Sequence, residues 1–553
     1  MANEISLLGA DGRPLPPARA SFGDSTVRTE GLPLAGASVF PYDASSWTTQ
    51  EMGDWLPWIR SPDAEINQFR DRMVARNRDL VRNDGLAQGA ITRILDNTVG
   101  VSMRLSAMPD YRALAMMTGI SAFDAEWANE FQRAAEALWR GFADDIGRYS
   151  DLSRQMTVSQ QLRLGLRHKL VDGDSLIVNY WKPDRVYPGG ARYATCYLVV
   201  DPDRLSNPYQ MVDTKYLRNG VEIDDDGVPI AYHIRKAHQN DWYNAIESNE
   251  WERIEREDDD GWMRVIHDFE RDRAGQNRGI GIFTSVLSRF KMLARYYGVE
   301  LQAATIASSF GTYITSPFDS AQVEEAINGG DELSAYQNLR ADFHESRPVM
   351  LNGARIPTLA PGESIETVAG AHPHSGFGEF VRAMQLTFAA ATGVSAEQIT
   401  QDWSRTNYSS ARAALLESWK TLERRRAEFK IGTASPMYAV WLHEAMDRGE
   451  LPLPRNAPDF LECRTQYARC DWLSVGRGWV DPVKEPQGAV LKMDAGLSTL
   501  KRECAEQAMD YEEAIDQRAL EVRKFKEAGL KLPDWYGAPA AEASTPEESP
   551  TPQ

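Results

Sequence analysis

Apolar positions between residues 62 and 143 recur at intervals of three and four residues, as on one face of an α-helix. The first two such stretches are separated by Asn83-Asp84-Gly85, three residues that favour a turn. A third stretch ends at Ala143 and places Trp127, Phe131 and Leu138 at helical spacing. The pattern predicts three amphipathic helices whose aromatic stripes belong to a core, rather than to a cofactor pocket.

After residue 170 the apolar period changes to two. Segments 172–183 and 191–205 are rich in Val, Tyr, Thr and Leu, which favours strands. Segment 220–238 reads as a hairpin with Asp225-Asp226-Gly227 at its turn, and a second acidic turn spans 258–261. Such clusters can bind calcium, but neither has the spacing and closing Glu of an EF-hand loop. We therefore favour hairpin turns.

Two long helical patterns, 282–308 and 372–393, flank a compact insert at 309–371. The first carries its apolar residues at three- and four-residue intervals: Val286, Phe290, Leu293, Tyr297 and Leu301. The second places four on one face: Phe377, Val381, Met384 and Phe388. The insert has two extended segments around an acidic helix. This arrangement suggests a stalk that carries a tip.

The remaining segments differ in composition. Residues 1–50, rich in Gly, Pro, Ala and Ser, predict an extended arm, and residues 537–553 predict a disordered tail because they lack large apolar side chains. Between residues 394 and 410 we expect a loop, followed by a long helix from residue 411 and several short helices within 480–536.

The chain of 553 residues implies about three to five domains. Its 61 Lys and Arg against 80 Asp and Glu give a net charge of −19. This balance argues against a protein that wraps DNA by neutralising phosphates, but not against a bore through which DNA slides. Four cysteines are too few for a disulfide scaffold, and Cys463 and Cys470 lack the partners of a zinc site. Without a signal peptide pattern or a long apolar stretch, we expect a soluble intracellular protein or part of a soluble assembly, with no membrane partner.

Motifs that carry chemistry are absent from the sequence. No GxxxxGK[ST], HExxH or GxSxG occurs, and Gly279-Ile280-Gly281 lacks the third glycine of a dinucleotide motif. His372 and His374 have no clear third ligand. We therefore expect no cofactor, no metal site, no catalytic residues and no enzymatic activity, and we favour an assembly component.

Five segments occur in an order that is hard to obtain by accident. They are RNRDLVRNDGLAQGAITRILDNTVG, GVEIDDDGVPIAYHIRK, VIHDFERDRAGQNRGIGIFTSVL, NYSSARAALLESW and VDPVKEPQGAVLKMDAGLSTLKRE. Together they resemble the portal proteins of tailed bacteriophages, of the phage lambda type. The resemblance runs from about residue 50 to residue 530.

The resemblance implies a homo-oligomeric ring, usually a dodecamer, at one vertex of the capsid in the virion, assembled in the host bacterial cytoplasm. Double-stranded DNA is packaged and ejected through its axial channel without sequence-specific contacts. The implied partners are the terminase large subunit during packaging, a head-tail adaptor (connector) protein afterwards, and the major capsid and scaffold proteins. The implied fold is α+β and mainly helical, with a wing containing β-structure, a stem, a small α/β clip and a crown.

The segments map onto that plan in chain order. The wing is expected at 51–281 and 411–479, the stem helices at 282–308 and 372–393, the clip at 309–371, the tunnel loop at 394–410 and the crown at 480–536. The resemblance makes four residues of the tunnel loop candidates for lining the channel: Gln401, Asp402, Trp403 and Arg405. It makes Glu324 and Glu325 of the clip candidates for partner binding.

Several alternatives stay open. Trp403 either projects into the bore or lies in the core of a buried connector. Arg289, Lys291 and Arg295 either face DNA or form ion pairs between subunits. For Arg424-Arg425-Arg426 we favour a solvated or ion-paired surface over a nucleic-acid patch. The chain as a whole could also be another ring or baseplate structural protein of a phage, or a DNA-processing enzyme such as a nuclease.

Overall fold

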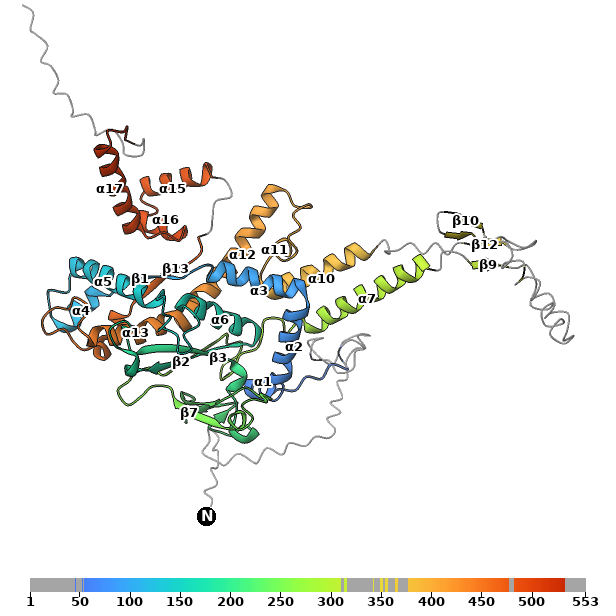
Figure 1. Cartoon of the computed structure of the whole chain (residues 1–553), viewed down its shortest axis with the longest axis horizontal. Helices are drawn as coiled ribbons and strands as arrows, with labels where there is room; N and C mark the ends of the chain where they lie inside the picture. Colours follow the sequence, from blue (N-terminus) through green and yellow to red (C-terminus); the bar gives the residue numbers. More distant parts are fainter. Residues whose placement is uncertain are drawn as a thin grey trace, which may run out of the picture. The chain divides into compact units, whose positions relative to one another are not determined.

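The structure is a computed structural model that describes residues 54–309, 313–315, 349–351, 354–356, 364–366, 376–476 and 482–532, with Ser45, Met52 and Asp342. The chain divides into two units, Met1–Arg60 and Ser61–Gln553, and the following description concerns the second. It combines many helices with short antiparallel sheets (Figure 1), which confirms the mixed, mainly helical α+β class.

The first helices are α1 (Pro62–Ile66), α2 (Arg70–Asn83) and α3 (Gly85–Thr98). Asp84 separates the last two, because its carboxylate accepts hydrogen bonds from the backbone N–H groups of Leu86 and Ala87 at 2.9 and 3.0 Å. This N-cap satisfies donors that the first turn of α3 leaves unpaired. The predicted break between the two helices is confirmed.

The predicted aromatic stripe on α5 is confirmed as core. The stripe lies on α5 (Ala125–Ala143). The same hydrophobic core contains residues of α4 (Tyr111–Thr118), α6 (Val158–Val171), α13 (Ser435–Asp447) and α14 (Arg464–Tyr467). Trp127 and Phe131 are buried, and the ring centroid of Trp139 lies 5.2 Å from that of Trp441 and 5.8 Å from that of Trp472. Trp472 belongs to β13 (Cys470–Leu473), which pairs with β1 (Arg104–Ala107).

A three-stranded antiparallel sheet has β2 (Asp174–Trp181) between β3 (Thr195–Val200) and β8 (Val265–Phe269). A second sheet has four strands: β4 (Leu217–Arg218), β5 (Val221–Ile223), β6 (Pro229–Arg235) and β7 (Trp251–Glu255). Short 3₁₀ turns connect the elements of the body at Pro183–Arg185, Pro202–Arg204, Pro208–Gln210, Glu247–Asn249 and Phe460–Cys463.

Both acidic clusters are hairpin turns, as expected. Between β5 and β6, Gly227 has a φ of 82°, and the Asp224 carboxylate accepts a hydrogen bond from the backbone N–H of Val228 at 2.7 Å. At the second turn, Gly261 has a φ of 76° and the Asp258 carboxylate accepts from the backbone N–H of Trp262 at 2.7 Å. The carboxylates are thus used to close the turns.

A buried carboxylate at the start of β2 ties distant segments together. The Asp174 carboxylate lies 2.7 Å from Arg70 Nη2 of α2 and 2.8 Å from Arg278 Nε. It also accepts the backbone N–H of Gly279 at 2.6 Å, and His267 Nε2 lies 3.4 Å away. Burial alone raises the pKa of Asp174, but the two guanidinium groups outweigh it and hold the pKa well below the usual range.

Helices α7 (Leu287–Ser309) and α10 (Phe377–Thr392) lie side by side (Figure 1). Between them in sequence, the described strands are β9 (Tyr313–Thr315), β10 (Val349–Leu351), β11 (Ala354–Ile356) and β12 (Ser364–Glu366). β9 pairs with β12 and β10 pairs with β11, both antiparallel. The predicted extended segments are confirmed as strands, whereas the predicted acidic helix lies outside the described residues.

Segment 394–410 contains a short helix, which the prediction of a loop missed. Helix α11 (Ala396–Thr400) begins at a capping box in which Ser395 and Gln398 bond each other's backbone N–H groups. The side chain of Ile399 in this helix is buried. Helix α12 (Tyr408–Phe429) then begins three residues before the expected start, because Asn407 caps it, and it continues through a π-helical turn at Lys430–Ala434.

The expectation of several short helices near the end is confirmed by α15 (Lys484–Asp494), α16 (Leu500–Glu506) and α17 (Tyr511–Glu527). Among the described residues, no helix is both long enough and apolar enough to cross a membrane. Most of the predicted arm and the whole predicted tail lie outside the described residues, so those two assignments stay predictions.

Candidate functional site

The pair α7–α10 is held by an aromatic seam. The rings of Phe290 and Phe388 stack with centroids 3.7 Å apart, and those of Tyr296 and Phe377 stack at 5.5 Å. Phe290 precedes Tyr296 on α7, whereas its partner Phe388 follows Phe377 on α10. The two helices therefore run antiparallel. Leu293 is also buried in this seam face. The pair therefore forms one packed unit.

The apolar stripe that the sequence predicts for α7 is buried only near the start of the helix. Phe290 and Leu293 are buried, but Tyr297 is 41 % and Leu301 is 70 % exposed. Leu301 lies beyond Tyr296, the residue that packs on the first residue of α10, Phe377. The described part of α10 therefore offers it no partner.

Other apolar side chains of the pair lie away from the seam. Met292 and Val299 are seven residues apart on α7 and hence share a face, and both are exposed. Leu386 on α10 is half exposed. Clustered large apolar side chains on a surface commonly mark an interaction site.

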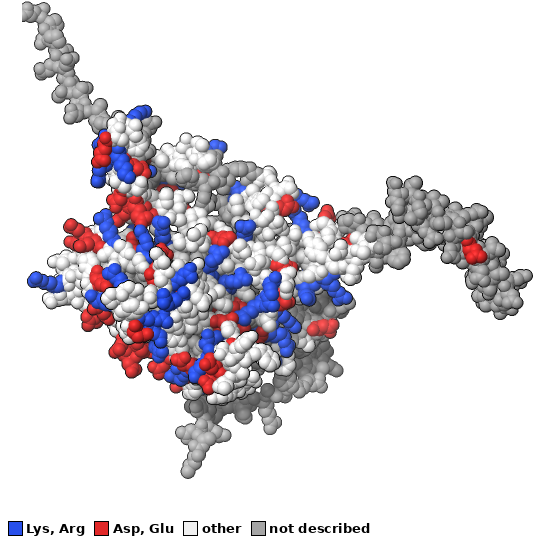
Figure 2. All heavy atoms as spheres, viewed as in Figure 1, with Lys and Arg blue, Asp and Glu red and all other residues white. Residues whose placement is uncertain are grey.

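Three basic residues of α7 are exposed: Arg289, Lys291 and Arg295. Within the described parts of the chain, none of them forms an ion pair. Figure 2 shows Lys and Arg interspersed with Asp and Glu over the face in view. Contact with DNA and ion pairing between subunits both remain open for these three residues.

The candidate channel-lining residues lie together on the exposed connection between α11 and α12. Gln401 ends α11 with a φ of 59°. The Asp402 carboxylate accepts hydrogen bonds from the backbone N–H and hydroxyl of Ser404, which lower the pKa of Asp402. Arg405 is exposed, and Trp403 is 38 % exposed. In the single chain Trp403 therefore lies at the surface, which favours the exposed loop over a buried connector.

Helix α10, which precedes this region, packs closely against α12. Gly393 ends α10 with a φ of 69°, and a Cβ atom at this position would lie 2.7 Å from Thr421 Cγ2 of α12. Such a close approach requires glycine. The exposed connection thus projects from a base formed by α10, α11 and α12.

Two residues of the basic triplet on α12 brace that base. The guanidinium of Arg425 donates to the carbonyl oxygen of Thr392 at 2.6 Å, and that of Arg426 donates to Asn97 at 2.5 Å. Arg424 forms ion pairs with Glu270 and Glu428. The expected ion-paired surface is therefore confirmed for Arg424 alone, because Arg425 and Arg426 are partly buried and bind backbone carbonyl oxygens instead of carboxylates.

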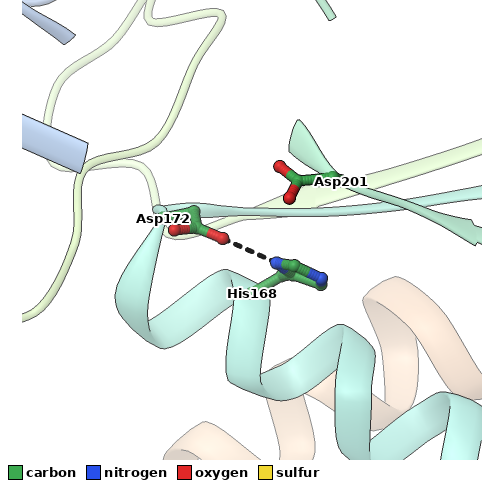
Figure 3. A group of neighbouring side chains, drawn as sticks. All are labelled: His168, Asp172 and Asp201. Carbon is green, nitrogen blue, oxygen red and sulfur yellow. Dashed lines mark hydrogen bonds and ion pairs between the residues drawn. The ribbon is translucent and has the colours of Figure 1, made fainter. Parts of the chain in front are cut away.

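One group of potential metal ligands occurs in the described residues: His168, Asp172 and Asp201 (Figure 3). The guanidinium of Arg78 already occupies the space between the carboxylates, with Nε 2.7 Å from Asp172 and Nη2 2.6 Å from Asp201. A third contact joins Arg78 to Asp203 at 2.7 Å. Burial raises the pKa of Asp172, but hydrogen bonds from His168 and Arg78 outweigh it and lower the pKa. The group is an ion-pair network.

The other candidates from the sequence are not brought together. Glu324, Glu325, His372 and His374 lie outside the described residues. Cys463 is buried, and the Cys470 thiol lies 3.4 Å from the Ser435 hydroxyl. One arrangement was not predicted from the sequence: Arg133 and Arg140 on α5 contact the acidic first turn of α17. Their seven-residue spacing places them on one helix face, but no pattern in the sequence identifies α17 as the partner.

A family model described as phage portal protein, lambda family, matches residues 48–426 of the chain. The chain belongs to the lambda family of phage portal proteins. Portal protein B of Escherichia phage lambda is 33 % identical over 495 residues, which cover 88 % of this chain and 90 % of the relative. The portal protein of Escherichia phage N15 is also 33 % identical, over 88 % of this chain and 91 % of its own length.

Two more distant similarities were also found. A probable portal protein of Halomonas phage phiHAP-1 is 23 % identical over 502 residues, covering 88 % of this chain and 87 % of its own. A solved structure of the neck of an empty gene transfer agent particle, computed with C6 symmetry, has a TM-score of 0.41 at 15 % identity, and covers 78 % of this chain and 93 % of its own. The family assignment rests on the sequence relatives.

This portal protein therefore has a structural role in a phage virion. The assignment agrees with the resemblance found in the sequence, and it decides against a baseplate protein or a DNA-processing enzyme. The family is structural.

Proposed function

We propose that copies of this portal protein close into a ring whose axial channel passes double-stranded DNA, with the pair α7–α10 as the stem. The observation that carries the proposal is the apolar surface on α7 and α10 away from their own seam, at Met292, Val299 and Leu386. A helix pair with a filled seam gains further burial by packing against the next copy of itself. Repetition of one such head-to-tail contact generates a ring. Twelve copies are usual for portals.

The other parts take the roles that the family resemblance implies. The body formed by residues 51–281 and 411–479 is the wing, 309–371 is the clip, and 480–536 is the crown inside the capsid. The connection with Gln401, Asp402, Trp403 and Arg405 is the tip of the tunnel loop. Its exposure suits a segment that contacts DNA or a neighbouring copy in the bore.

A weakly attractive channel suits DNA that must move. Each phosphate contact by Lys or Arg adds affinity and would slow sliding. The net charge of −19 favours few such contacts. The absence of a phosphate-binding motif from the sequence implies that this chain does not hydrolyse nucleotides, so the terminase, which docks on the clip, supplies the energy of packaging. A head-tail adaptor takes that place after packaging, and the capsid and scaffold proteins contact the wing and crown.

Ring closure is tested by placing charge on the outer face of α7. In the double variant Met292→Glu and Val299→Glu, the introduced carboxylates would be buried without partners at every subunit contact. We expect a folded protein that no longer forms rings, as judged by light scattering after size exclusion and by negative-stain microscopy. The matched control is Met116→Glu with Met117→Glu, two exposed methionines of α4.

Rings with a central hole in the control, and their loss in the α7 variant, support the proposal. Rings that persist in the α7 variant contradict the assignment of this face. Wild-type oligomers without an axial hole wide enough for DNA would instead contradict the channel itself.

Docking of the terminase is tested separately at the clip. Replacement of Glu324 and Glu325 by Lys is expected to weaken terminase binding or ring closure while the wing stays folded. Normal DNA packaging by this double variant would count against a partner-binding role for the two residues.

A further inference from the structure

Ion pairs join the three C-terminal helices to the body of the protein. Arg104 of β1 lies 3.1 Å and Arg140 of α5 lies 2.5 Å from the Glu513 carboxylate of α17. Arg133 of α5 lies 3.0 Å from Glu512. A further pair joins Arg412 of α12 to Glu485 of α15 at 3.5 Å. In each pair the arginine belongs to the body and the glutamate to the C-terminal helices, so the two surfaces are complementary in charge.

Local structure orders the acidic side of this contact. Asp510 caps α17, and its carboxylate accepts hydrogen bonds from the backbone N–H groups of Glu512 and Glu513 at 2.7 and 3.3 Å. Carboxylates are favoured in the first turn of a helix, because the helix dipole places positive potential there. The first turn of α17 is therefore a fixed acidic group that faces the arginines of α5.

The contact lacks a shared apolar core. Among the described residues, the main hydrophobic cluster of the body contains no member of α15, α16 or α17. Helices α15 and α17 bury no residue at all, and Cys504 of α16 is the buried side chain of the three helices. Between α17 and the β1–β13 pair lies an open cavity of about 850 Å³. Apolar side chains from both sides line it without filling it, including Val101, Leu473, Met509 and Leu520.

We propose that Arg104, Arg133 and Arg140 with Glu512 and Glu513 form a releasable electrostatic latch, which closes α15–α17 over this cavity and lets them lift when the ion pairs are screened. Exposed ion pairs contribute little individually and are weakened by salt. Because the described residues of these helices share no hydrophobic cluster with the body, the ion pairs make a large part of the contact. The latch lies within one chain, so this inference does not depend on the proposed ring.

One half-buried carboxyl group makes the latch sensitive to pH as well. Glu136 lies between Arg133 and Arg140 on α5, and it accepts the backbone N–H of Ala107 of β1 at 2.9 Å. Burial, together with Asp510 and Glu512 of α17, raises the pKa of Glu136 to about 7. A further titratable group that faces it is Tyr438 of α13.

The sign of the pH effect follows from this shift. Release of α17 hydrates Glu136 and removes its two acidic neighbours, so its pKa falls in the open state. A group whose pKa is raised in the closed state stabilises that state while it is protonated. The latch therefore weakens as the pH rises through about 7.

The test uses a thiol placed on the inner side of α17. Ala514 is half-buried and lines the cavity, so Ala514→Cys in the full-length protein reports opening by its rate of maleimide labelling. Peptide mass spectrometry follows each cysteine separately, and the buried Cys196 and Cys463 of the body serve as internal controls. From about 0.05 M to about 1 M NaCl we expect labelling at position 514 to accelerate about tenfold while the controls stay slow.

A charge exchange separates the latch from general loosening. Arg133→Glu alone should speed labelling severalfold at low salt, because it places a carboxylate against Glu512. The exchanged pair, Arg133→Glu with Glu512→Arg, should slow it again. The matched control is Arg253→Glu, which breaks an ion pair with Glu222 far along the chain in β7. The latch is overturned if the labelling rate at position 514 changes neither with salt nor with Arg133→Glu. It is also overturned if labelling at Cys196 and Cys463 accelerates equally.

Discussion

The rings of Phe290 and Phe388 lie face to face, with centroids 3.7 Å and planes 7° apart, at the end of the α7–α10 pair where Phe283 also packs. Each ring is 1 % exposed. This stacked pair fixes the register of two helices whose sequences are separated by the whole of the proposed clip. The angle and height of the proposed stem therefore depend on it.

Truncation of this pair should loosen the stem. Phe388→Ala is expected to cost about 3–5 kcal/mol of unfolding free energy, because it removes a fully buried ring and leaves a cavity against Phe290. Chemical denaturation of wild type and variant at the same protein concentration measures the loss. Ile246→Ala, at a side chain that is 79 % exposed, is the matched control and should change stability by less than about 1 kcal/mol. Equal effects of the two substitutions would contradict a structural role for the stack.

A second prediction concerns the buried carboxylate of Asp174. Asp174→Asn should cost about 3–5 kcal/mol, because Arg70 and Arg278 stay buried without a compensating charge. Glu222→Gln, which breaks a partly exposed pair with Arg253, should cost less than about 1 kcal/mol. Both values come from denaturation at neutral pH.

The pH dependence of wild type checks the same site. The pKa of Asp174 is depressed in the folded protein, so its contribution to stability is complete above its unfolded pKa of about 4 and is lost as the pH falls further. The unfolding free energy of wild type should therefore decline more steeply below about pH 4 than that of Asp174→Asn. If the unfolding free energies of the two proteins instead decline in parallel below about pH 4, Asp174 is not the paired carboxylate.

Local patterns were sufficient to predict much of this fold. The break at Asp84, the acidic hairpin turns at Gly227 and Gly261, and the aromatic core face of α5 all depend on residues close in sequence. The family was also readable, because five segments kept their order along the chain. Each of these features is set by residue type and spacing.

Features that depend on distant residues were not readable. The exposure of Tyr297 and Leu301 depends on where α10 begins, which the stripe on α7 does not encode. Helix α11 is a mixed case: the capping box of Ser395 and Gln398 that starts it is a local signal, whereas the burial of Ile399 depends on the rest of the fold. The ion pairs between α5 and α17 join segments more than three hundred residues apart. No periodicity links such partners.

The third prediction concerns the protonation of Glu136. In the Ala514→Cys background, the labelling rate relative to a free thiol should rise from about pH 6 to about pH 8, because ionised Glu136 repels Asp510 and Glu512. Glu136→Gln removes the ionisable group and keeps the acceptor for the Ala107 N–H, so its relative labelling rate should stay low and flat over this range. A slope that survives Glu136→Gln would assign the pH effect to another group.

The last prediction tests the exposed connection between α11 and α12. Trp403 is 38 % exposed, so Trp403→Ala should change the unfolding free energy of the protein by less than about 1 kcal/mol, rather than by the 3–5 kcal/mol or so of a core aromatic residue. If the connection lines the bore, the same variant should form normal rings yet reduce DNA packaging or retention. Packaging is measured as nuclease-protected DNA per particle, and stability by denaturation of the purified protein.

Asp402→Asn is a useful companion variant, because it keeps the hydrogen bonds from Ser404 and changes only the charge. Strong destabilisation by Trp403→Ala would contradict a channel-lining role for Trp403, because it would show that the indole is buried in the assembled protein. Unchanged stability together with unchanged packaging would remove Trp403 from the channel-lining set.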